Sequence, residues 1–132
     1  QVSACAATPC QVAAIEALEG PQDHLKYMVE QYRLRRDYVM RRISEIPGLS
    51  CHAPAGTFYA FIDISQLGMP CEEFAMKLLE ERQVVVVPGT AFGEFGEGYI
   101  RLSYATSMQC LEQGLQELEE FVRSHKTEGD PA

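Results

Sequence analysis

Arg101 is the residue whose type and position most clearly suggest chemistry. It lies in the middle of YIRLSYA, residues 99–105, directly after a glycine-rich loop. A planar guanidinium can hold a carboxylate through two parallel charge-assisted hydrogen bonds. Arginine is rarely buried without an anionic partner, so Arg101 requires one. From the residues alone, that partner is either a bound carboxylate or an acidic side chain of the same chain in a structural ion pair.

The glycine-rich segment PGTAFGEFGEG, residues 88–98, could be mistaken for a phosphate-binding loop. It lacks the Lys-Ser/Thr pair of a P-loop, and its glycines do not open a helix as a dinucleotide fingerprint requires. Its two glutamates would also repel a phosphate. We therefore interpret it as the loop that leads into the Arg101 strand and not as a nucleotide site.

The lysines and cysteines suggest no further chemistry. Lys26, Lys77 and Lys126 are expected on charged helix surfaces or in the tail, where an ammonium stays solvated and protonated. The five cysteines form no CxxC pair and no Cys/His cluster with metal-ligand spacing, so the sequence predicts no metal site. An odd, scattered set suggests buried or half-buried thiols in a reducing compartment, and we expect a cytoplasmic protein.

Several elements must position Arg101. Apolar residues at helical spacing predict helices over residues 8–19, 22–46 and 71–82, and a last helix from a cap at Ser107 to about residue 124. Segments rich in β-branched and aromatic residues predict strands at 57–64, 84–87 and 99–105. This order predicts an α+β fold in which helices cover one face of a small sheet.

Composition and charge exclude several classes of function. The chain has 132 residues, a net charge of −8 and a pI near 4.8, so its surface repels nucleic acids and anionic lipids. No apolar run approaches the roughly 18–20 residues that span a bilayer. The start, QVSACAATPCQ, lacks the basic region of a signal peptide. Because there is no initiator methionine, we expect the chain to begin inside a larger protein.

The stretch VVVVPGTAFGEFGEGYIRLSYA, residues 84–105, resembles the C-terminal small domain of class I, fold-type I pyridoxal-phosphate-dependent aminotransferases of the aspartate-aminotransferase type. In that family a V-x-V-x-P-G-x-x-F-G run precedes the element I-R-L-S-Y-A. GTFYAFIDI, residues 56–64, is similar to the family's glycine-aromatic strand. EQYRLRRDYVMRRISEIPG, residues 30–48, resembles its inter-domain helix, and QVAAIEAL, residues 11–18, the helix before it.

The resemblance implies that Arg101 binds the substrate's α-carboxylate. Transamination needs the substrate's Cα–H bond perpendicular to the cofactor plane, and a carboxylate fixed in its own plane sets that torsion. Phe58 aligns with an aromatic residue that lines the substrate side of the site in the family, although it could equally be a sheet-core phenylalanine. Tyr59 and Tyr104 are expected to be packing residues.

The resemblance also implies a division into three parts. Residues 1–46 would be helices that link to or pack on a large domain outside this chain, residues 47–126 the small domain with its mostly antiparallel sheet, and residues 127–132 a tail. The family's catalytic lysine and its pyridoxal 5′-phosphate site would lie upstream of residue 1, because no lysine here has the family's Ser-x-x-Lys context. We therefore expect no catalytic residue, no bound cofactor and no activity in the isolated chain.

In the whole protein, the resemblance implies a transaminase that moves an amino group between an amino acid, aspartate-like or similar, and a 2-oxo acid, in a homodimer. Two alternatives stay open. One is a lyase built on the same pyridoxal-phosphate scaffold. The other is a stand-alone interaction module that binds a partner through its first two helices. Apolar stripes on those helices also predict self-association.

Overall fold

The computed structural model describes residues 5–125 and divides into two compact units, residues 1–31 and 32–132. Lys126 and the tail predicted over 127–132 lie outside the described residues. Within residues 5–125, no helix has both the length and the apolar character that crossing a membrane requires. The same range holds no group of three or more potential metal-ligating side chains.

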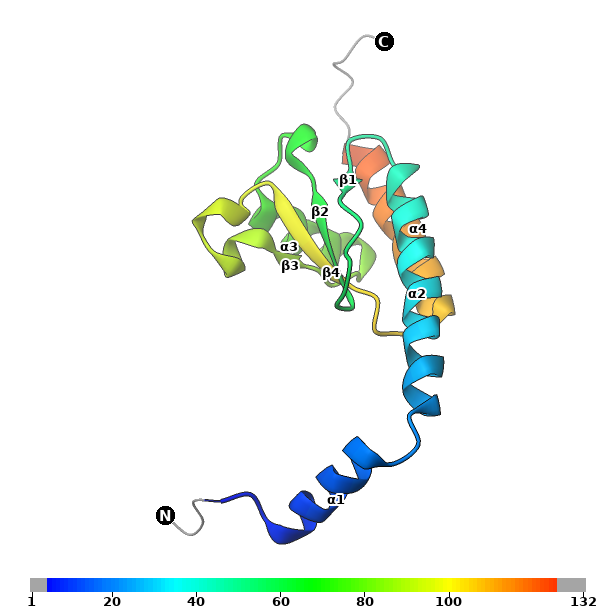
Figure 1. Cartoon of the computed structure of the whole chain (residues 1–132). Coiled ribbons are helices and arrows are strands. Elements are labelled where there is room, and N and C mark those ends of the chain that lie inside the picture. The colour runs from blue at the N-terminus through cyan, green and yellow to red at the C-terminus, as the bar shows by residue number, and fades with distance from the viewer. Residues whose placement is uncertain (1–4, 126–132) are drawn as a thin grey trace. The chain divides into compact units, whose positions relative to one another are not determined.

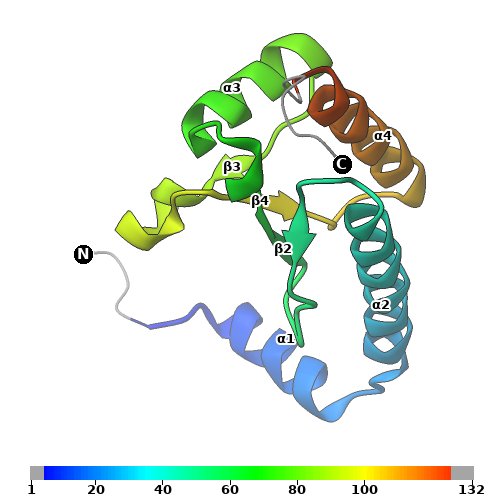
Figure 2. The same cartoon turned by 90° about the horizontal axis from the view of Figure 1, so that it is seen from above.

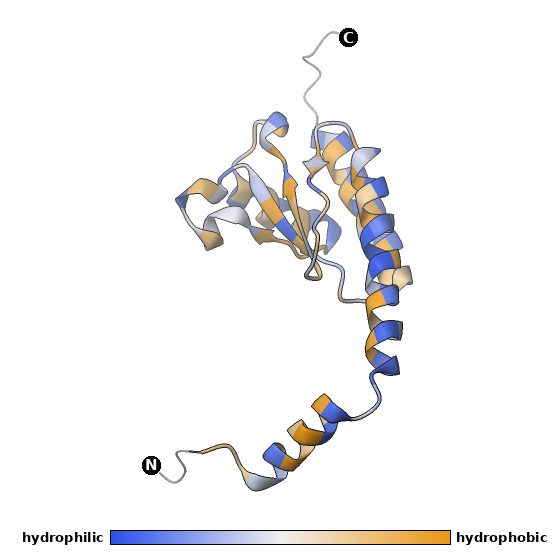
Figure 3. Ribbon diagram, in the orientation of Figure 1, coloured by the Kyte–Doolittle hydropathy of each residue, from blue (hydrophilic) through white to orange (hydrophobic). Residues whose placement is uncertain are grey.

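The first unit consists of α1, Thr8–Glu19, and the start of α2, Asp23–Ser44. Pro9 lies in the first turn of α1, where a missing N–H costs no hydrogen bond, and the Gly20 N–H donates to Glu16 O at 2.8 Å at its end. No residue of α1 is buried, although Figure 3 shows that several of its residues are hydrophobic. Both helices lie where periodicity predicted them.

The second unit begins within α2, at residue 32. The reason is that Val39 and Ile43, in the last turns of α2, are buried in the core of the second unit. Arg42 also joins α2 to α4, Met108–His125, through an ion pair of 2.6 Å with Glu119. In Figure 1, α4 overlaps the part of α2 that belongs to the second unit, and in Figure 2 the two helices lie at an angle to each other. Whether residues 1–46 pack on a further domain stays a prediction.

Four antiparallel strands form one sheet in the order β1-β2-β4-β3. Their bounds are Ser50–Cys51 for β1, Tyr59–Asp63 for β2, Val87–Pro88 for β3 and Tyr99–Ser103 for β4. The two outer strands have only two residues each. The sequence did not predict β1, because two residues give no periodicity.

The strand predicted over residues 84–87 is largely wrong. Only Val87 of that run lies in a strand, and Val85 is 73% exposed, so the run is not a buried strand. A proline is tolerated in an edge strand because its missing N–H can face solvent, which explains why β3 includes Pro88. The four consecutive valines therefore lead into a short edge strand and do not form an interior strand.

One face of the sheet is buried beneath the helices and the other is open. Ala60 and Ile62 of β2 and Ile100 and Leu102 of β4 point into the core, as strand alternation requires. The helical contributions to that core come from α2, from α3, Cys71–Arg82, and from α4. Figures 1 and 2 show these helices on one side of the strands. The α+β prediction is confirmed, including the single helix-covered face.

The start and the inner face of α4 follow the sequence prediction. Ser107 Oγ accepts a hydrogen bond from the Cys110 N–H at 3.2 Å, which is the expected N-cap. The predicted inward residues are all buried; they are Leu111, Leu115, Leu118 and Val122. Phe121 is buried as well, with its ring edge-on to Phe74 at 5.1 Å between centroids.

The expectation of buried or half-buried cysteines is wrong for three of the five. Cys71 is buried and Cys51 is partly buried, but Cys5, Cys10 and Cys110 are exposed. Within residues 5–125, no two cysteines form a disulfide. Composition could predict the absence of a disulfide framework, but it could not place individual thiols relative to the core.

Candidate active-site element

Arg101 lies at the centre of β4, on the open face of the sheet. It pairs with Phe61 of β2 on one side and with Val87 of β3 on the other. The predicted alternation is confirmed: Tyr99, Arg101 and Ser103 are at least partly exposed, whereas Ile100, Leu102 and Tyr104 are buried. Arg101 is itself half-buried. The strand therefore presents the guanidinium to the side of the sheet that the helices leave uncovered.

The guanidinium of Arg101 lies over two aromatic rings. Its Cζ is 4.2 Å from the ring centroid of Tyr59 and 4.6 Å from that of Phe92. Tyr59 begins β2, and Phe92 ends the 3₁₀ helix Gly89–Phe92 in the glycine-rich loop. Both distances are well within the range of a cation–π interaction. The strand β2 and the glycine-rich loop are far apart in sequence, but each provides one ring that contacts the guanidinium of Arg101.

Arg101 makes no ion pair or hydrogen bond with any residue of the described range 5–125. The structural ion pair that the sequence left open is thus not formed there. No buried side-chain nitrogen or oxygen in that range lacks a partner, so the guanidinium nitrogens of Arg101 must reach solvent. A half-buried arginine with accessible N–H groups and no carboxylate of its own is suited to bind an external anion.

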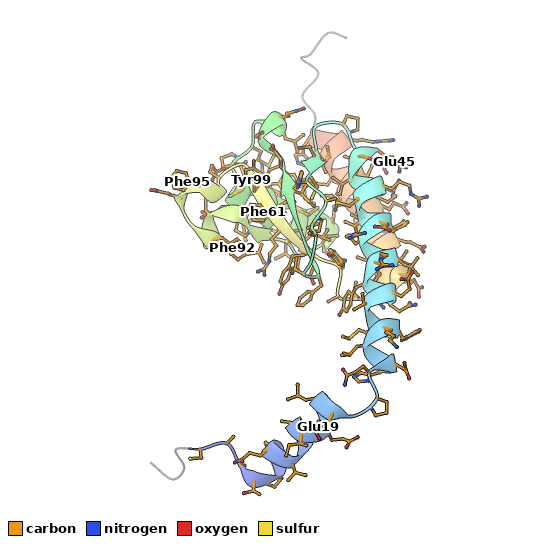
Figure 4. The ribbon with its side chains drawn as sticks, viewed as in Figure 1. Glu19, Glu45, Phe61, Phe92, Phe95 and Tyr99 are labelled. Atoms are coloured by element: carbon orange, nitrogen blue, oxygen red, sulfur yellow. The ribbon has the colours of Figure 1, made fainter. Side chains whose placement is uncertain are left out.

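Further aromatic side chains continue the open face beyond Arg101. Phe61 stacks on Tyr99 with 5.1 Å between centroids and meets Phe92 edge-on at 6.1 Å. In Figure 4, Phe61, Tyr99 and Phe92 lie together, and Phe95 lies at the outer end of the loop. Phe61 is 40% exposed and Phe92 is 52% exposed, so the open face is aromatic as well as cationic.

Phe58 lies immediately before β2 and is not part of the sheet core. It is 39% exposed and packs against the rings of Tyr59, at 4.4 Å, and Tyr32, at 6.1 Å. Two hydrogen bonds fix its backbone: the Tyr104 N–H donates to Phe58 O at 2.9 Å, and the Tyr104 hydroxyl donates to Thr57 O at 3.0 Å. The core alternative for Phe58 therefore does not hold, and a role in lining the substrate pocket stays a prediction.

The loop that carries Phe92 is closed by two glycines in direct backbone contact. A Cβ added at Gly89 would collide with the carbonyl of Gly96, and a Cβ added at Gly96 would collide with the carbonyl of Gly89. Neither glycine has a positive φ, so the requirement is for space and not for an unusual backbone conformation. These glycines let the two short 3₁₀ helices of the loop pack against each other.

Glu97 fastens the same loop to the start of α3. Its carboxylate accepts a hydrogen bond from the Cys71 N–H at 2.9 Å and another from Cys71 Sγ at 3.3 Å. These bonds, the first above all, lower the pKa of the Glu97 carboxyl below its usual value. A carboxylate at a helix N-terminus also interacts favourably with the helix dipole. Thr90 adds a second link, since its hydroxyl donates to Glu72 at 3.0 Å.

The described lysines are unsuited to bind an aldehyde cofactor covalently. Lys77 forms an ion pair of 2.6 Å with Glu73, and this partner raises the pKa of the Lys77 ammonium. Lys26 pairs with Asp23 at 3.1 Å on an exposed helix surface. A nucleophilic amine needs the opposite, a lowered pKa in a desolvated site. Lysine residues within 5–125 therefore do not fit the cofactor that the resemblance implies.

Sequence reasoning found Arg101 but treated Tyr59 as a packing residue and did not assign Phe92. Alternation along the strand could have placed Tyr59 on the same face as Phe61. The register that brings Tyr59 beside Arg101, Phe61↔Arg101 and Tyr59↔Ser103, is visible only in the structure. Tyr104 is buried, as expected of a packing residue.

Comparisons with known proteins identify the family of this fold. The family model for class I and II aminotransferases matches residues 2–118. A Bacillus subtilis protein named as an aminotransferase is 46% identical over 93% of this chain, and an aspartate aminotransferase of Pyrococcus horikoshii is 42% identical over 88%. The solved structure of an alanine aminotransferase from Pyrococcus furiosus has a TM-score of 0.87 and 38% identity, covering 91% of this chain and 31% of its own.

The chain spans 31% and 30% of the lengths of those two sequence relatives. The match nevertheless includes every element that positions Arg101, from α2 to β4. The resemblance noted from residues 84–105 is thus confirmed by a model that covers most of the chain. The chain belongs to the class I and class II aminotransferase family.

Proposed function

We propose that this chain supplies the α-carboxylate site of a transaminase, with Arg101 as the residue that binds the carboxylate. The observation that carries this proposal is the guanidinium on the open sheet face, over two rings and with no acidic partner in residues 5–125. Family membership supports the reaction class, amino-group exchange between an amino acid and a 2-oxo acid. In this role Arg101 fixes the plane of the substrate carboxylate and thereby the torsion of the adjoining Cα.

The relatives' names differ in the amino acid they use, aspartate in one case and alanine in another. An α-carboxylate is common to all amino acids and 2-oxo acids, so a single arginine can serve all of them. We propose an amino acid, aspartate-like or similar, as the donor, with its side chain bound by residues beyond this chain. Phe58, exposed near Tyr59, is the residue of this chain that we propose as a lining of the substrate pocket.

Pyridoxal phosphate is the cofactor that the family implies. It would supply an electron sink for the bonds at the substrate's Cα. The lysines within residues 5–125 carry ion-pair partners, so we propose that the lysine that holds the cofactor belongs to another part of the whole protein. The purified 132-residue chain is accordingly expected to show no transaminase turnover with added cofactor, glutamate and a 2-oxo acid. Turnover would contradict this assignment.

The carboxylate site itself can be tested on this chain by NMR, with propionate as the probe. Propionate should shift the side-chain signals of Arg101, and Arg101→Ala should weaken the binding. A charge-assisted hydrogen bond contributes about 1.5–3 kcal/mol, which corresponds to a roughly 10- to 150-fold rise in Kd. Arg101→Lys should also bind weakly, since an ammonium keeps the charge but not the planar pair of donors.

A matched control is Arg82→Lys, because Arg82 already contacts Glu117 and Glu120 at 3.4 and 2.9 Å. This substitution should leave propionate binding unchanged. Equal propionate affinity in the wild-type chain and in Arg101→Ala would refute the carboxylate assignment.

We also propose that the protein is a cytoplasmic homodimer. The absence of a disulfide within residues 5–125 supports a reducing compartment. Exposed apolar side chains on α1 support self-association, since Val12 is 62%, Ile15 56% and Leu18 82% exposed. Sedimentation equilibrium should give twice the mass of the chain, and Leu18→Gln should lower the association constant. A monomer at all concentrations would contradict the homodimer.

A further inference from the structure

The two rings that contact Arg101 restrict the directions from which an anion can approach it. The Tyr59 and Phe92 centroids lie 4.2 and 4.6 Å from the guanidinium carbon, so both rings occupy space close to the guanidinium. The N–H groups point outward in the guanidinium plane and reach solvent. An anion is therefore received in the plane, at the donor edges, and excluded where the rings lie.

The shape of the anion then matters. A carboxylate is planar, and both of its oxygens can lie in the guanidinium plane while they accept two parallel hydrogen bonds. A tetrahedral oxyanion cannot place all its oxygens in one plane, so at least one oxygen projects out of it, and an oxygen that projects on the side of Tyr59 or Phe92 comes close to a ring. The face of an aromatic ring is electrically negative and attracts cations. An oxygen that carries negative charge is repelled there.

We propose that Tyr59 and Phe92 are positioning residues that make Arg101 selective for planar carboxylates over tetrahedral oxyanions. This inference rests on the proposed carboxylate site and adds to it a reason for selectivity that the charge of Arg101 alone does not provide. A carboxylate and a tetrahedral oxyanion can each carry a single negative charge. The preference for the carboxylate would therefore come from the two rings and not from a difference in net charge.

The position of Phe92 is fixed by the rest of the loop, as the inference requires. Phe61 meets the Phe92 ring edge-on at 6.1 Å. The Gly89–Gly96 backbone contact and the bonds of Glu97 to Cys71 hold the loop that carries the ring. Phe92 is thus supported from the sheet, from its own loop and from α3, although it is 52% exposed.

The test compares acetate with methanesulfonate, two small anions of equal charge that differ in shape. The measured quantity is the ratio of the methanesulfonate Kd to the acetate Kd, from NMR titration of the Arg101 side chain in the 132-residue chain. Phe92→Leu should lower this ratio by about threefold, taking the oxygen–ring repulsion as equal in size to the attraction in an exposed cation–π contact. The guanidinium itself can bind the two anions with different affinities, and this difference contributes to the ratio in every variant. The informative quantity is therefore the change in the ratio between the wild type and a variant.

Two further variants separate positioning from a general effect on the loop. Phe95→Leu removes a ring of the same loop that is 91% exposed, and it should leave the ratio unchanged. Phe92→Tyr keeps a ring in place and should keep the wild-type ratio. A second measurement needs no variant: in the unliganded wild-type chain, the Arg101 δ-protons should be shifted upfield by the two rings relative to those of exposed arginines.

The possible outcomes distinguish this inference from the proposed function. The inference is supported if the ratio of the two Kd values falls in Phe92→Leu but not in Phe95→Leu or Phe92→Tyr, and if the Arg101 δ-protons of the wild type are shifted upfield. Binding of both anions at Arg101 with the same ratio in all variants overturns the inference and leaves the carboxylate site intact. An unshifted Arg101 in the unliganded chain overturns it as well. Failure of acetate to bind at Arg101 in the wild type overturns the carboxylate site and the selectivity together.

Discussion

Replacing Gly96 by alanine is expected to destabilise the second unit by about 1–3 kcal/mol, the usual range for overpacking a closely packed site. The added methyl group would collide with the Gly89 carbonyl and would lie 3.0 Å from the Thr90 amide nitrogen. These are backbone atoms, so no side chain can rotate to make room. The loop must open, and Phe92, which follows Gly89 by three residues, must move with it.

The measurement is thermal unfolding of the chain followed by circular dichroism. A change of 1 kcal/mol shifts the Tm of a domain of this size by about 4 °C, so Gly96→Ala should lower the Tm by about 4–12 °C. The matched control is Gly114→Ala in α4, where an added Cβ would meet no atom within 4 Å. Alanine is favoured over glycine in a helix by about 0.5–1 kcal/mol, so this control should raise the Tm.

Opposite signs for the two glycine substitutions are the essential result. If Gly96→Ala left the Tm unchanged or raised it while Gly114→Ala behaved as expected, the Gly89–Gly96 contact would not be a packing constraint. Phe92 would then not be held in place by this contact. A further readout follows from the same reasoning: Gly96→Ala should reduce the acetate preference of Arg101, because the displaced Phe92 no longer covers the guanidinium.

Two other predictions concern titratable groups. Because the folded pKa of Glu97 is lowered, its bonds to Cys71 stabilise the fold above the carboxyl's unfolded pKa and are lost as the pH falls through the folded value. The Tm of Glu97→Gln should therefore lie below that of the wild type at pH 7 and converge with it on acidification, and a constant difference across pH would contradict the assignment. Hydrogen bonds from Ser107 and then Thr106 lower the pKa of the exposed Cys110 thiol. Iodoacetamide should therefore alkylate Cys110 well before the buried Cys71, and Ser107→Ala should slow the reaction at Cys110; an unchanged rate by mass spectrometry would show that the cap does not activate the thiol.

Local patterns predicted the helices and the Arg101 strand because each is long enough to show its period. The inward residues of α4 and the alternation around Arg101 could be named in advance for that reason. The run of four valines misled the strand prediction, since β-branched composition indicates a strand wherever it occurs. Here the next residue is Pro88 on a sheet edge, and the edge position cannot be seen without the strand order.

The site was only partly predictable for a related reason. Arg101 could be singled out from its strand and from the family resemblance, but its surroundings depend on non-local contacts. Phe92 reaches it because Gly89 and Gly96 close the loop, and Tyr59 reaches it because β2 and β4 pair in one register. A single sequence contains neither the register nor the close approach of two backbones.

The short edges of the sheet affect how this chain can associate with other copies of itself. A sheet edge with free N–H and C=O groups is a template for another strand and a common start of aggregation. Here each edge strand has two residues, and on β3 one of them is Pro88, which has no N–H to donate. An added strand would find almost no ladder to extend. Growth of a continuous β-sheet is therefore disfavoured, and the self-association proposed above would use exposed side chains such as the apolar ones of α1.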